Sequence, residues 1–218
     1  MSLPLIVVVG AGPGVSGSLA RRYAREGYAV VLIGNEEAPV RALAEELEAG
    51  GTTVRWDVVD VTDAAAASRA IADLAGQVGR VDVLHFNPSA FRQKDPLELQ
   101  VDELLADVAL GVGALLTAVQ AVRPFMSAGA RVTVTGSMAA DKPWNQAASL
   151  GVQKAGVRNL VHSLDTSLAP EGIRAVSVTV RGMLSEEGAV TPDRVAEALY
   201  AAAWQDEDAW RTEISYEG

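Results

Sequence analysis

The sequence predicts an α/β fold in which one doubly wound parallel sheet, of about seven strands, carries helices on both faces. Short aliphatic runs alternate with apolar stripes at helical spacing along nearly all of the 218 residues. The first run also passes directly through a glycine-rich turn into a helical stripe, which is the opening unit of a Rossmann-like fold. Nothing resembles a linker, so we expect residues 1–218 to form a single dinucleotide-binding domain.

The N-terminal run Leu5–Val9 consists of five aliphatic residues, as in a strand that is buried on both faces of a parallel sheet. The turn that follows contains Gly10, Gly12 and Gly14, and glycine lets a backbone approach a pyrophosphate closely. Val15 then opens a helix whose unpaired N–H groups and dipole favour an anion. These three glycines and Val15 are the first candidate cofactor-binding residues.

The next elements continue the alternation. Residues 29–33 form a second aliphatic run, and residues 40–47 carry a helical stripe that two glycines end. A short third strand is expected at residues 54–56, before an alanine-rich helix over residues 64–78. Residues 81–86 read as the fourth strand.

The second half of the chain follows the same order. Helical stripes are expected at residues 101–108 and 115–122, and then a fifth strand at residues 131–135. A long helix precedes the sixth strand at residues 174–180. Thr191-Pro192 is typical of a helix start, because a hydroxyl cap is followed by proline at the first helical position. A last strand is expected at residues 210–214.

Charge and composition limit the possible partners. The net charge is −10 and the pI is about 4.7, so we expect no nucleic acid partner and no binding to an anionic membrane. The absence of cysteine excludes disulfides, thiolate metal sites and cysteine nucleophiles. The N-terminus lacks a basic leader, and we expect no apolar run to approach membrane-spanning length. We therefore expect a cytoplasmic protein.

The order and spacing of these elements resemble the short-chain dehydrogenase/reductase family over nearly the whole chain. The family's TGxxxGxG loop corresponds to Val9–Ser16, in which Gly10 and Gly14 match. Its adenine-contacting DV pair corresponds to Asp60-Val61. Of its NNAG stretch after the fourth strand, only Asn87 remains. The resemblance makes Asp60, Val61 and Asn87 candidate cofactor-binding residues.

The resemblance also implies a catalytic site for hydride transfer between a nicotinamide and a carbonyl or alcohol. The family's serine, which binds the substrate oxygen, corresponds to Ser137. Its YxxxK pair corresponds to Leu150–Lys154, where the lysine binds the nicotinamide ribose and lowers the phenol's pKa. Ser137 and Lys154 are therefore candidate catalytic residues, and Lys154 is also a cofactor candidate. Leu150 has no proton to transfer, which predicts low or altered activity.

The cofactor implied by the resemblance is NAD or NADP, with Gly182 beside the nicotinamide. NAD-preferring relatives place an acid at the end of the second strand, where this chain has Gly34. NADP-preferring relatives place an arginine beside it, where this chain has Asn35, the remaining cofactor candidate. No cation is expected near a 2′-phosphate, and Glu36-Glu37 would repel one. The sequence therefore favours NAD over NADP.

The segment that would recognise a substrate is short. Between Gly182 and Thr191 there is little room for the mobile stretch that closes over the substrate in the family, so we expect a site open to water. Glu186 replaces a cofactor-contacting threonine and would repel a pyrophosphate unless it points away. The sequence does not identify the substrate, which we expect to be a small carbonyl or alcohol.

Several candidates have structural alternatives. Ser137 and Asn87 would serve equally as backbone partners at strand ends, and Asp60 as a residue at a helix start. His85 and His162 have apolar neighbours and no metal-ligand spacing, so we expect packed histidines and no metal site. Flavoproteins and methyltransferases share a glycine turn, but both need an acid at the end of the second strand, where this chain has none.

Two functions remain open. The first is a nicotinamide-dependent oxidoreductase that uses a proton source other than tyrosine. The second is a catalytically degenerate relative that binds a dinucleotide, or nothing, and acts in regulation or assembly. The family resemblance also implies a homo-oligomer formed through helices after the fourth and fifth strands, where the stripe Val157–Leu168 serves either that contact or the core.

Overall fold

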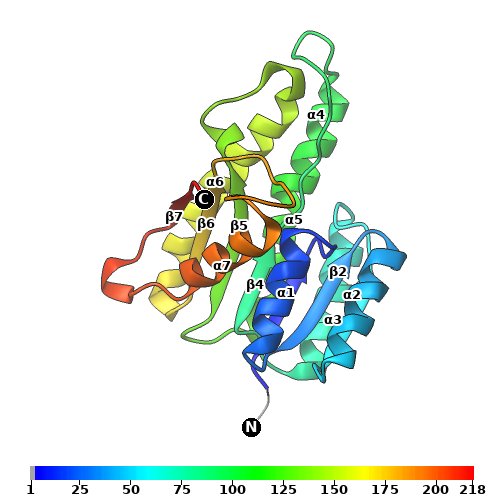
Figure 1. The fold of residues 1–218 in the computed structure, drawn as a ribbon, viewed down its shortest axis with the longest axis vertical. Coiled ribbons are helices and arrows are strands. Elements are labelled where there is room, and N and C mark those ends of the chain that lie inside the picture. Colours follow the sequence, from blue (N-terminus) through cyan, green and yellow to red (C-terminus); the bar gives the residue numbers. More distant parts are fainter. Residues whose placement is uncertain (1–2) are drawn as a thin grey trace.

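One sheet of seven parallel strands runs through the molecule in the order β3-β2-β1-β4-β5-β6-β7, in a computed structural model that describes residues 3–218 (Figure 1). The strand order reverses between β1 and β4, and ligands of doubly wound folds bind at the carboxyl ends of strands at such a point. The predicted fold class is confirmed. The strands are β1 (Leu5–Val9), β2 (Ala29–Gly34), β3 (Val54–Val58), β4 (Val83–Phe86), β5 (Arg131–Ser137), β6 (Arg174–Val180) and β7 (Glu213–Tyr216).

Helices cover both faces of this sheet. They are α1 (Val15–Arg25), α2 (Glu37–Ala49), α3 (Ala64–Val78), α4 (Val101–Val108), α5 (Ala114–Val122), α6 (Ala148–Leu168) and α7 (Pro192–Ala203). Helices α1, α2 and α7 pack on the face that carries Ile6 and Val8 of β1. Helices α3, α5 and α6 pack on the face that carries Val7 and Val9. Both faces of β1 are therefore buried, as its unbroken aliphatic sequence predicts.

Side-chain caps determine where two helices begin. The Asp63 carboxylate accepts hydrogen bonds from two N–H groups in the first turn of α3, at 3.1 and 3.0 Å. The Thr191 hydroxyl accepts from the N–H of Arg194 at 3.3 Å, and Pro192 is the first residue of α7. Such a cap satisfies donors that lack partners inside the helix and stabilises it by about 1 kcal/mol. The predicted start of the last helix is confirmed.

Some predicted boundaries differ from the structure. The third strand continues to Val58 and the fifth to Ser137, because parallel pairing with β2 and β6 extends past the apolar runs. The last strand begins at Glu213 rather than at residue 210. Trp210 instead lies beneath the guanidinium groups of Arg131 and Arg174, 5.4 and 4.7 Å from its ring centroid.

The two predicted helices of residues 101–108 and 115–122 form one continuous rod. A π-helical turn, Ala109–Gly113, joins α4 to α5, and the rod continues to Phe125. Its mean hydropathy reaches 1.8, so by length and composition alone the rod is long enough and apolar enough to cross a membrane. This corrects the expectation that no apolar run approaches that length. Core helices pass the same test, and Leu115 and Val122 of this rod are buried against the sheet.

The stripe Val157–Leu168 of α6 faces the core. Val157, Val161 and Leu168 are buried and pack with the strand residues of that face. The sequence left this stripe open between the core and a partner; these three side chains lie in the core, and Leu160 and Leu164 are half-buried beside them. Exposed apolar side chains on this side of the sheet include Leu105 and Leu116 of the α4–α5 rod, which are 60% and 42% exposed, and Val152 of α6, which is 48% exposed.

Candidate active site

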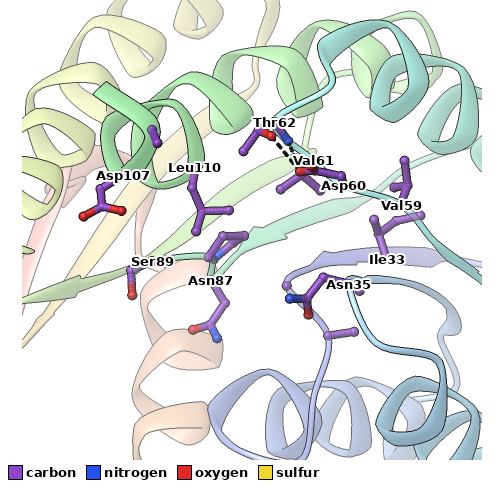
Figure 2. A pocket seen from close by; sticks show the side chains of 15 residues that line it. Ile33, Asn35, Val59, Asp60, Val61, Thr62, Asn87, Ser89, Asp107 and Leu110 are labelled. Atoms are coloured by element: carbon purple, nitrogen blue, oxygen red, sulfur yellow. Dashed lines mark hydrogen bonds between the residues drawn. The ribbon is translucent and has the colours of Figure 1, made fainter. Parts of the chain in front are cut away.

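A cavity of about 700 Å³ opens at the carboxyl edge of the sheet (Figure 2). Its volume lies in the range typical of small-molecule and cofactor sites. Asn35, which follows β2, and Asn87, which follows β4, both line the cavity. The cavity brings together five predicted cofactor-binding residues, which are Gly10, Asn35, Asp60, Val61 and Asn87. The other predicted residues of the site do not line this cavity; they are Gly12, Gly14, Val15, Ser137, Lys154 and Gly182.

The turn after β1 allows a ligand to approach the backbone closely. Gly10 has a φ of +82°, and a Cβ at this position would lie 2.8 Å from the ring of Pro88. A Cβ at Gly12 or Gly14 would meet nothing within 4 Å among the described residues, so there is open space beside both. Helix α1 begins at Val15 with no side-chain cap from residues 3–218. Its first N–H groups therefore remain available to an anion.

Gly17 also shapes this turn, although the sequence analysis did not single it out. A Cβ on Gly17 would lie 2.4 Å from the carbonyl oxygen of Gly12, so only glycine lets the turn lie against the first turn of α1. The sequence does indicate this role, because Gly17 is a fourth glycine close to the other three.

The part of the cavity beside Asp60 is acidic. The Asp60 carboxylate accepts hydrogen bonds from the Thr62 hydroxyl at 2.7 Å and the Thr62 N–H at 2.9 Å, which hold its pKa below the usual value (Figure 2). A Cβ on Gly34 would lie 2.3 Å from a methyl group of Val40, so α2 occupies the place where an acid would stand. The described residues that line the cavity include two ionisable side chains, Asp60 and Asp107, and no cation.

Ser137 ends β5 at the same edge of the sheet. Its Oγ accepts a hydrogen bond from the N–H of Ala139 at 3.2 Å, which is the backbone role that the structural alternative predicts. A hydroxyl that accepts one bond still has its own proton to donate. The observed bond therefore fixes the hydroxyl oxygen and leaves its O–H available to a ligand oxygen.

Lys154 is buried in α6 and reaches β5 near Ser137. Its Nζ donates to the carbonyl oxygen of Thr135 at 2.9 Å, two residues before Ser137. Burial lowers the pKa of Lys154 to about 8. An ammonium group has three donors, so two remain after the bond to Thr135. Leu150 precedes Lys154 by one helical turn, so both lie on the same side of α6, and Leu150 is partly exposed.

A family model described as short chain dehydrogenase matches residues 4–192. This chain is a short-chain dehydrogenase/reductase. The family consists of NAD(P)-dependent oxidoreductases, and the resemblance inferred from the glycine turn and the Ser137–Lys154 spacing is confirmed at the level of the family.

Several relatives of this short-chain dehydrogenase/reductase have been named. It is 29% identical to Sulfoacetaldehyde reductase 2 of Chromohalobacter salexigens, over 80% of this chain and 70% of that protein. It is 30% identical to Oxidoreductase UcpA of Escherichia coli K12, over 79% of this chain and 66% of that protein. These names belong to the relatives and not to this chain.

Solved structures share its fold. A dehydrogenase/reductase from Sinorhizobium meliloti 1021 superposes with a TM-score of 0.90 at 21% identity, over 100% of this chain and 95% of the other. A metagenomic short-chain oxidoreductase in complex with NADP superposes with a TM-score of 0.87 at 23% identity, over 100% of this chain and 99% of the other. At these identities the likeness concerns the fold.

The four tyrosines of this short-chain dehydrogenase/reductase have other places in the fold. Tyr23 of α1 packs edge-on against Tyr28 and against Tyr200 of α7, with ring centroids 5.0 and 5.1 Å away. The Tyr216 hydroxyl, on β7, donates to the carbonyl oxygen of Ala189 at 2.8 Å. No tyrosine within residues 3–218 therefore takes the place of the phenol that Leu150 lacks.

Gln153 supports the site and was missed by the sequence analysis. Its side-chain amide accepts from the N–H of Ala90 at 2.9 Å and donates to the carbonyl oxygen of Ala90 at 3.1 Å. A Cβ on Gly111 would lie 2.5 Å from its Oε1, so the π-helical turn leaves room for this amide. Helix α6 thereby holds the loop that follows Asn87. The sequence held no signal for this, because a buried glutamine is recognised only by its partners.

His85 is fully buried between two threonines. His85 Nδ1 lies 3.0 Å from the Thr133 hydroxyl, and the other ring nitrogen lies 3.5 Å from the Thr135 hydroxyl. Burial lowers the pKa of His85 to about 3, so the ring is neutral. The predicted packed state of His85 is confirmed.

The same expectation is wrong for His162. This residue is exposed on the solvent side of α6, because it follows the inward-facing Val161 by one position and so turns away from the core. Its apolar neighbours in the sequence are neighbours along the helix and not in space.

The segment after β6 is short and folds on itself. A Cβ on Gly182 would lie 2.8 Å from a methyl group of Val190, so glycine is required here by packing. The N–H of Ser185 donates to the carbonyl oxygen of Val190 at 3.0 Å, which closes the segment. Met183 is 90% exposed, and Glu186 is also exposed.

Proposed function

We propose that this protein transfers a hydride between a nicotinamide cofactor and a small carbonyl or alcohol, with Lys154 as the proton source in place of a tyrosine. The supporting observation is the buried amine of Lys154, held 2.9 Å from the strand that ends in Ser137. Its pKa of about 8 lets it carry a proton at neutral pH and still release it. A group of this kind suits general acid–base catalysis, because its pKa lies near the working pH.

Reduction of a carbonyl requires a hydride at carbon and a proton at oxygen. A bound nicotinamide supplies the hydride. Ser137, its oxygen held by the N–H of Ala139, donates its O–H to the carbonyl oxygen and orients it. Lys154 transfers a proton from Nζ to the oxygen as the alcohol forms, and the neutral amine regains a proton from solvent. In alcohol oxidation the neutral amine accepts the proton instead.

The cofactor would lie along the carboxyl edge of the sheet. The backbone of Gly10, Gly12 and Gly14 and the start of α1 would hold the pyrophosphate. The adenosine would occupy the cavity of about 700 Å³, against Asn35, Asp60 and Val61. Asn87, Gly182 and Lys154 would meet the nicotinamide end.

We propose NAD as the preferred cofactor. Gly34 is confined by Val40, the described cavity lining offers no cation to a 2′-phosphate, and Glu36-Glu37 follow directly in the chain. A titration with NADH and NADPH, followed by nicotinamide fluorescence, should give the lower dissociation constant for NADH. Tighter binding of NADPH would contradict this preference.

Two substitutions test the catalytic proposal. Lys154→Arg keeps a cation that does not release its proton near neutral pH, so hydride transfer should fall about 100-fold while NADH still binds. Lys142→Arg, at an exposed lysine, is the matched control and should change nothing. Leu150→Tyr supplies a phenol one turn before Lys154 and should raise the rate. NADH binding without transfer in either the natural protein or Leu150→Tyr would favour the binding or assembly function instead.

We also propose that the protein forms a homo-dimer through the α4–α5 rod. Leu105 and Leu116 both belong to this rod, one on each side of the π-helical turn. Both are exposed large apolar side chains, which mark contact surfaces when they group together.

A further inference from the structure

We propose that Asp141 is a positioning residue, which holds the turn that fixes the Ser137 hydroxyl through ion pairs with Arg158 and Arg181. This inference rests on the proposed function, because it concerns how Ser137 orients the carbonyl oxygen. None of the three charged side chains is among the described residues that line the cavity. They would therefore act through Ser137 and not on a ligand directly.

Asp141 ends the short turn that follows Ser137. The N–H of Ala139, inside this turn, donates to the Ser137 Oγ at 3.2 Å. The N–H of Asp141 donates to the carbonyl oxygen of Met138 at 3.0 Å and closes the turn, which is a single turn of 3₁₀-helix. A 3₁₀ turn has poorer hydrogen-bond geometry than an α-helix, so contacts from outside the turn contribute to holding it.

Two arginines from different elements hold the Asp141 carboxylate. Arg158 of α6 donates to one carboxylate oxygen at 2.6 Å, and Arg181, directly after β6, pairs with the other oxygen at 3.2 Å. The hydrogen bond from Arg158 holds the pKa of Asp141 below its usual value, so the carboxylate is charged throughout the neutral range. With both oxygens engaged, the turn cannot shift without breaking an ion pair.

The two arginines are themselves held in place. Arg158 also pairs with the Glu213 carboxylate at 3.3 Å, and that carboxylate accepts a hydrogen bond from the Thr179 hydroxyl at 2.6 Å. Arg181 donates to the Ser215 hydroxyl at 2.9 Å. The network therefore joins the turn to α6 and to the neighbouring strands β6 and β7 (Figure 1).

The charges of this network balance one another. Two arginines face two carboxylates, so no net charge is left to attract a ligand, which favours a positioning role over a binding site. The four charged side chains are 24–32% exposed. Ion pairs that form a network contribute more than isolated pairs on a surface, which contribute little.

Arg158 also relates the turn to the proposed proton source. Lys154 and Arg158 are four residues apart along α6, so they lie on one side of the helix. The ion pair between Arg158 and Asp141 therefore fixes the distance between the Ser137 turn and the part of α6 that carries Lys154. A misplacement of about 1 Å between reacting groups can lower a rate about 100-fold.

Reduction of diacetyl, a small diketone, with NADH by the full chain tests this inference. Asp141→Asn should lower kcat about tenfold, with the KM for diacetyl and the dissociation constant of NADH within about twofold, because the carbonyl still binds but is oriented less well. Asp141→Glu keeps the charge and should retain kcat within about threefold. The matched control is Glu197→Gln on α7, because Glu197 is also shared by two arginines, Arg22 and Arg25 at the far end of α1, at 2.9 and 3.6 Å.

A double-variant cycle separates positioning from a general loss of stability. Ser137→Ala leaves no hydroxyl to be oriented, so Asp141→Asn should lower the residual kcat of that variant no further. An equal fall of kcat in both backgrounds would overturn the inference. So would an unchanged kcat in Asp141→Asn, or the same fall in Glu197→Gln.

Amide hydrogen exchange gives a readout that needs neither cofactor nor activity. The N–H of Ala139 should exchange about tenfold faster in Asp141→Asn, while the amides of Leu5–Val9 keep their natural rates. Unchanged exchange at Ala139 would overturn the inference. Failure of the proposed function is distinguishable, since the natural protein would then reduce no carbonyl while the faster exchange at Ala139 still supports Asp141 as the residue that holds the turn.

Discussion

Lys154 combines a catalytic proposal with a measurable thermodynamic cost. Its pKa falls from an ordinary 10.5 to about 8 because burial disfavours the charged amine. Below pH 8 the folded protein must hold this buried charge, which costs about 3 kcal/mol relative to the unfolded chain. Above pH 8 the folded state releases the proton before the unfolded state does. The free energy of unfolding should therefore rise between pH 8 and about 10.5.

Lys154→Met is expected to stabilise the protein while removing activity. At pH 7 the free energy of unfolding should increase by about 2 kcal/mol, after allowance for the lost bond to Thr135. The gain should shrink as the pH rises from 8 to 10.5. Urea unfolding at several pH values measures this, with the exposed Lys142→Met as the control. If Lys154→Met has a lower free energy of unfolding than the natural protein at pH 7, burial of the charged amine does not destabilise the folded state.

The buried His85 predicts that the protein loses stability at low pH. Its pKa is lowered to about 3 by burial, so the unfolded chain binds a proton on this ring from about pH 6.5 downward and the folded protein does not. Stability should decline as the pH falls from 6.5 toward 3, by up to about 5 kcal/mol from this residue. His85→Phe should remove that part of the decline in urea unfolding. The exposed His162→Phe should not, and equal decline in all three proteins would contradict the account.

At the scale of elements, the contact between β2 and α2 limits which side chain can stand at position 34. A side chain at position 34 would meet Val40 at 2.3 Å from its Cβ. Gly34→Asp should therefore lower the free energy of unfolding by about 1–3 kcal/mol, as overpacked substitutions do. Val40→Ala makes room for the aspartate. The double variant should therefore exceed Gly34→Asp alone in both its free energy of unfolding and its NADH affinity. Thermal unfolding and NADH titration of the two variants decide this.

Elements were easier to predict than the contacts between them. The strand Leu5–Val9 and the helix start at Thr191-Pro192 can be predicted from the local sequence, and both are confirmed. The π-helical turn Ala109–Gly113 cannot be predicted from the neighbouring residues alone. It matches the volume of the Gln153 amide, which belongs to a helix about forty residues away. Sequence patterns report which side of an element is apolar, and they do not report which side chain fills a given space.

For the molecule as a whole, the sequence predicted one sheet with a cofactor cavity at its carboxyl edge, and the fold is confirmed. Asn35, Asp60 and Asn87 come from three different strand ends, yet the parallel topology brings them to one cavity. The solvent side of His162 and the core position of the Val157–Leu168 stripe depend on how α6 is rotated about its axis, which the sequence pattern did not settle.

Association is a property of the whole surface. If the α4–α5 rod forms the proposed two-fold contact, Leu105→Lys combined with Leu116→Lys should convert a dimer to a monomer. Both side chains are exposed, so folding should be unaffected and circular dichroism unchanged. Leu184→Lys, 53% exposed on the segment after β6, is the matched control. Light scattering that shows a monomer for the natural protein, or a dimer for the double variant, would contradict the proposal.

The most direct test of Lys154 as the proton source is the pH dependence of hydride transfer from bound NADH to a small carbonyl substrate in a single turnover. The account predicts a constant rate below pH 8 and a fall of about tenfold per pH unit above it, as the folded Lys154 loses its proton. Leu150→Tyr should move that fall to higher pH. A natural protein whose rate stays unchanged from pH 7 to pH 10 would contradict the assignment.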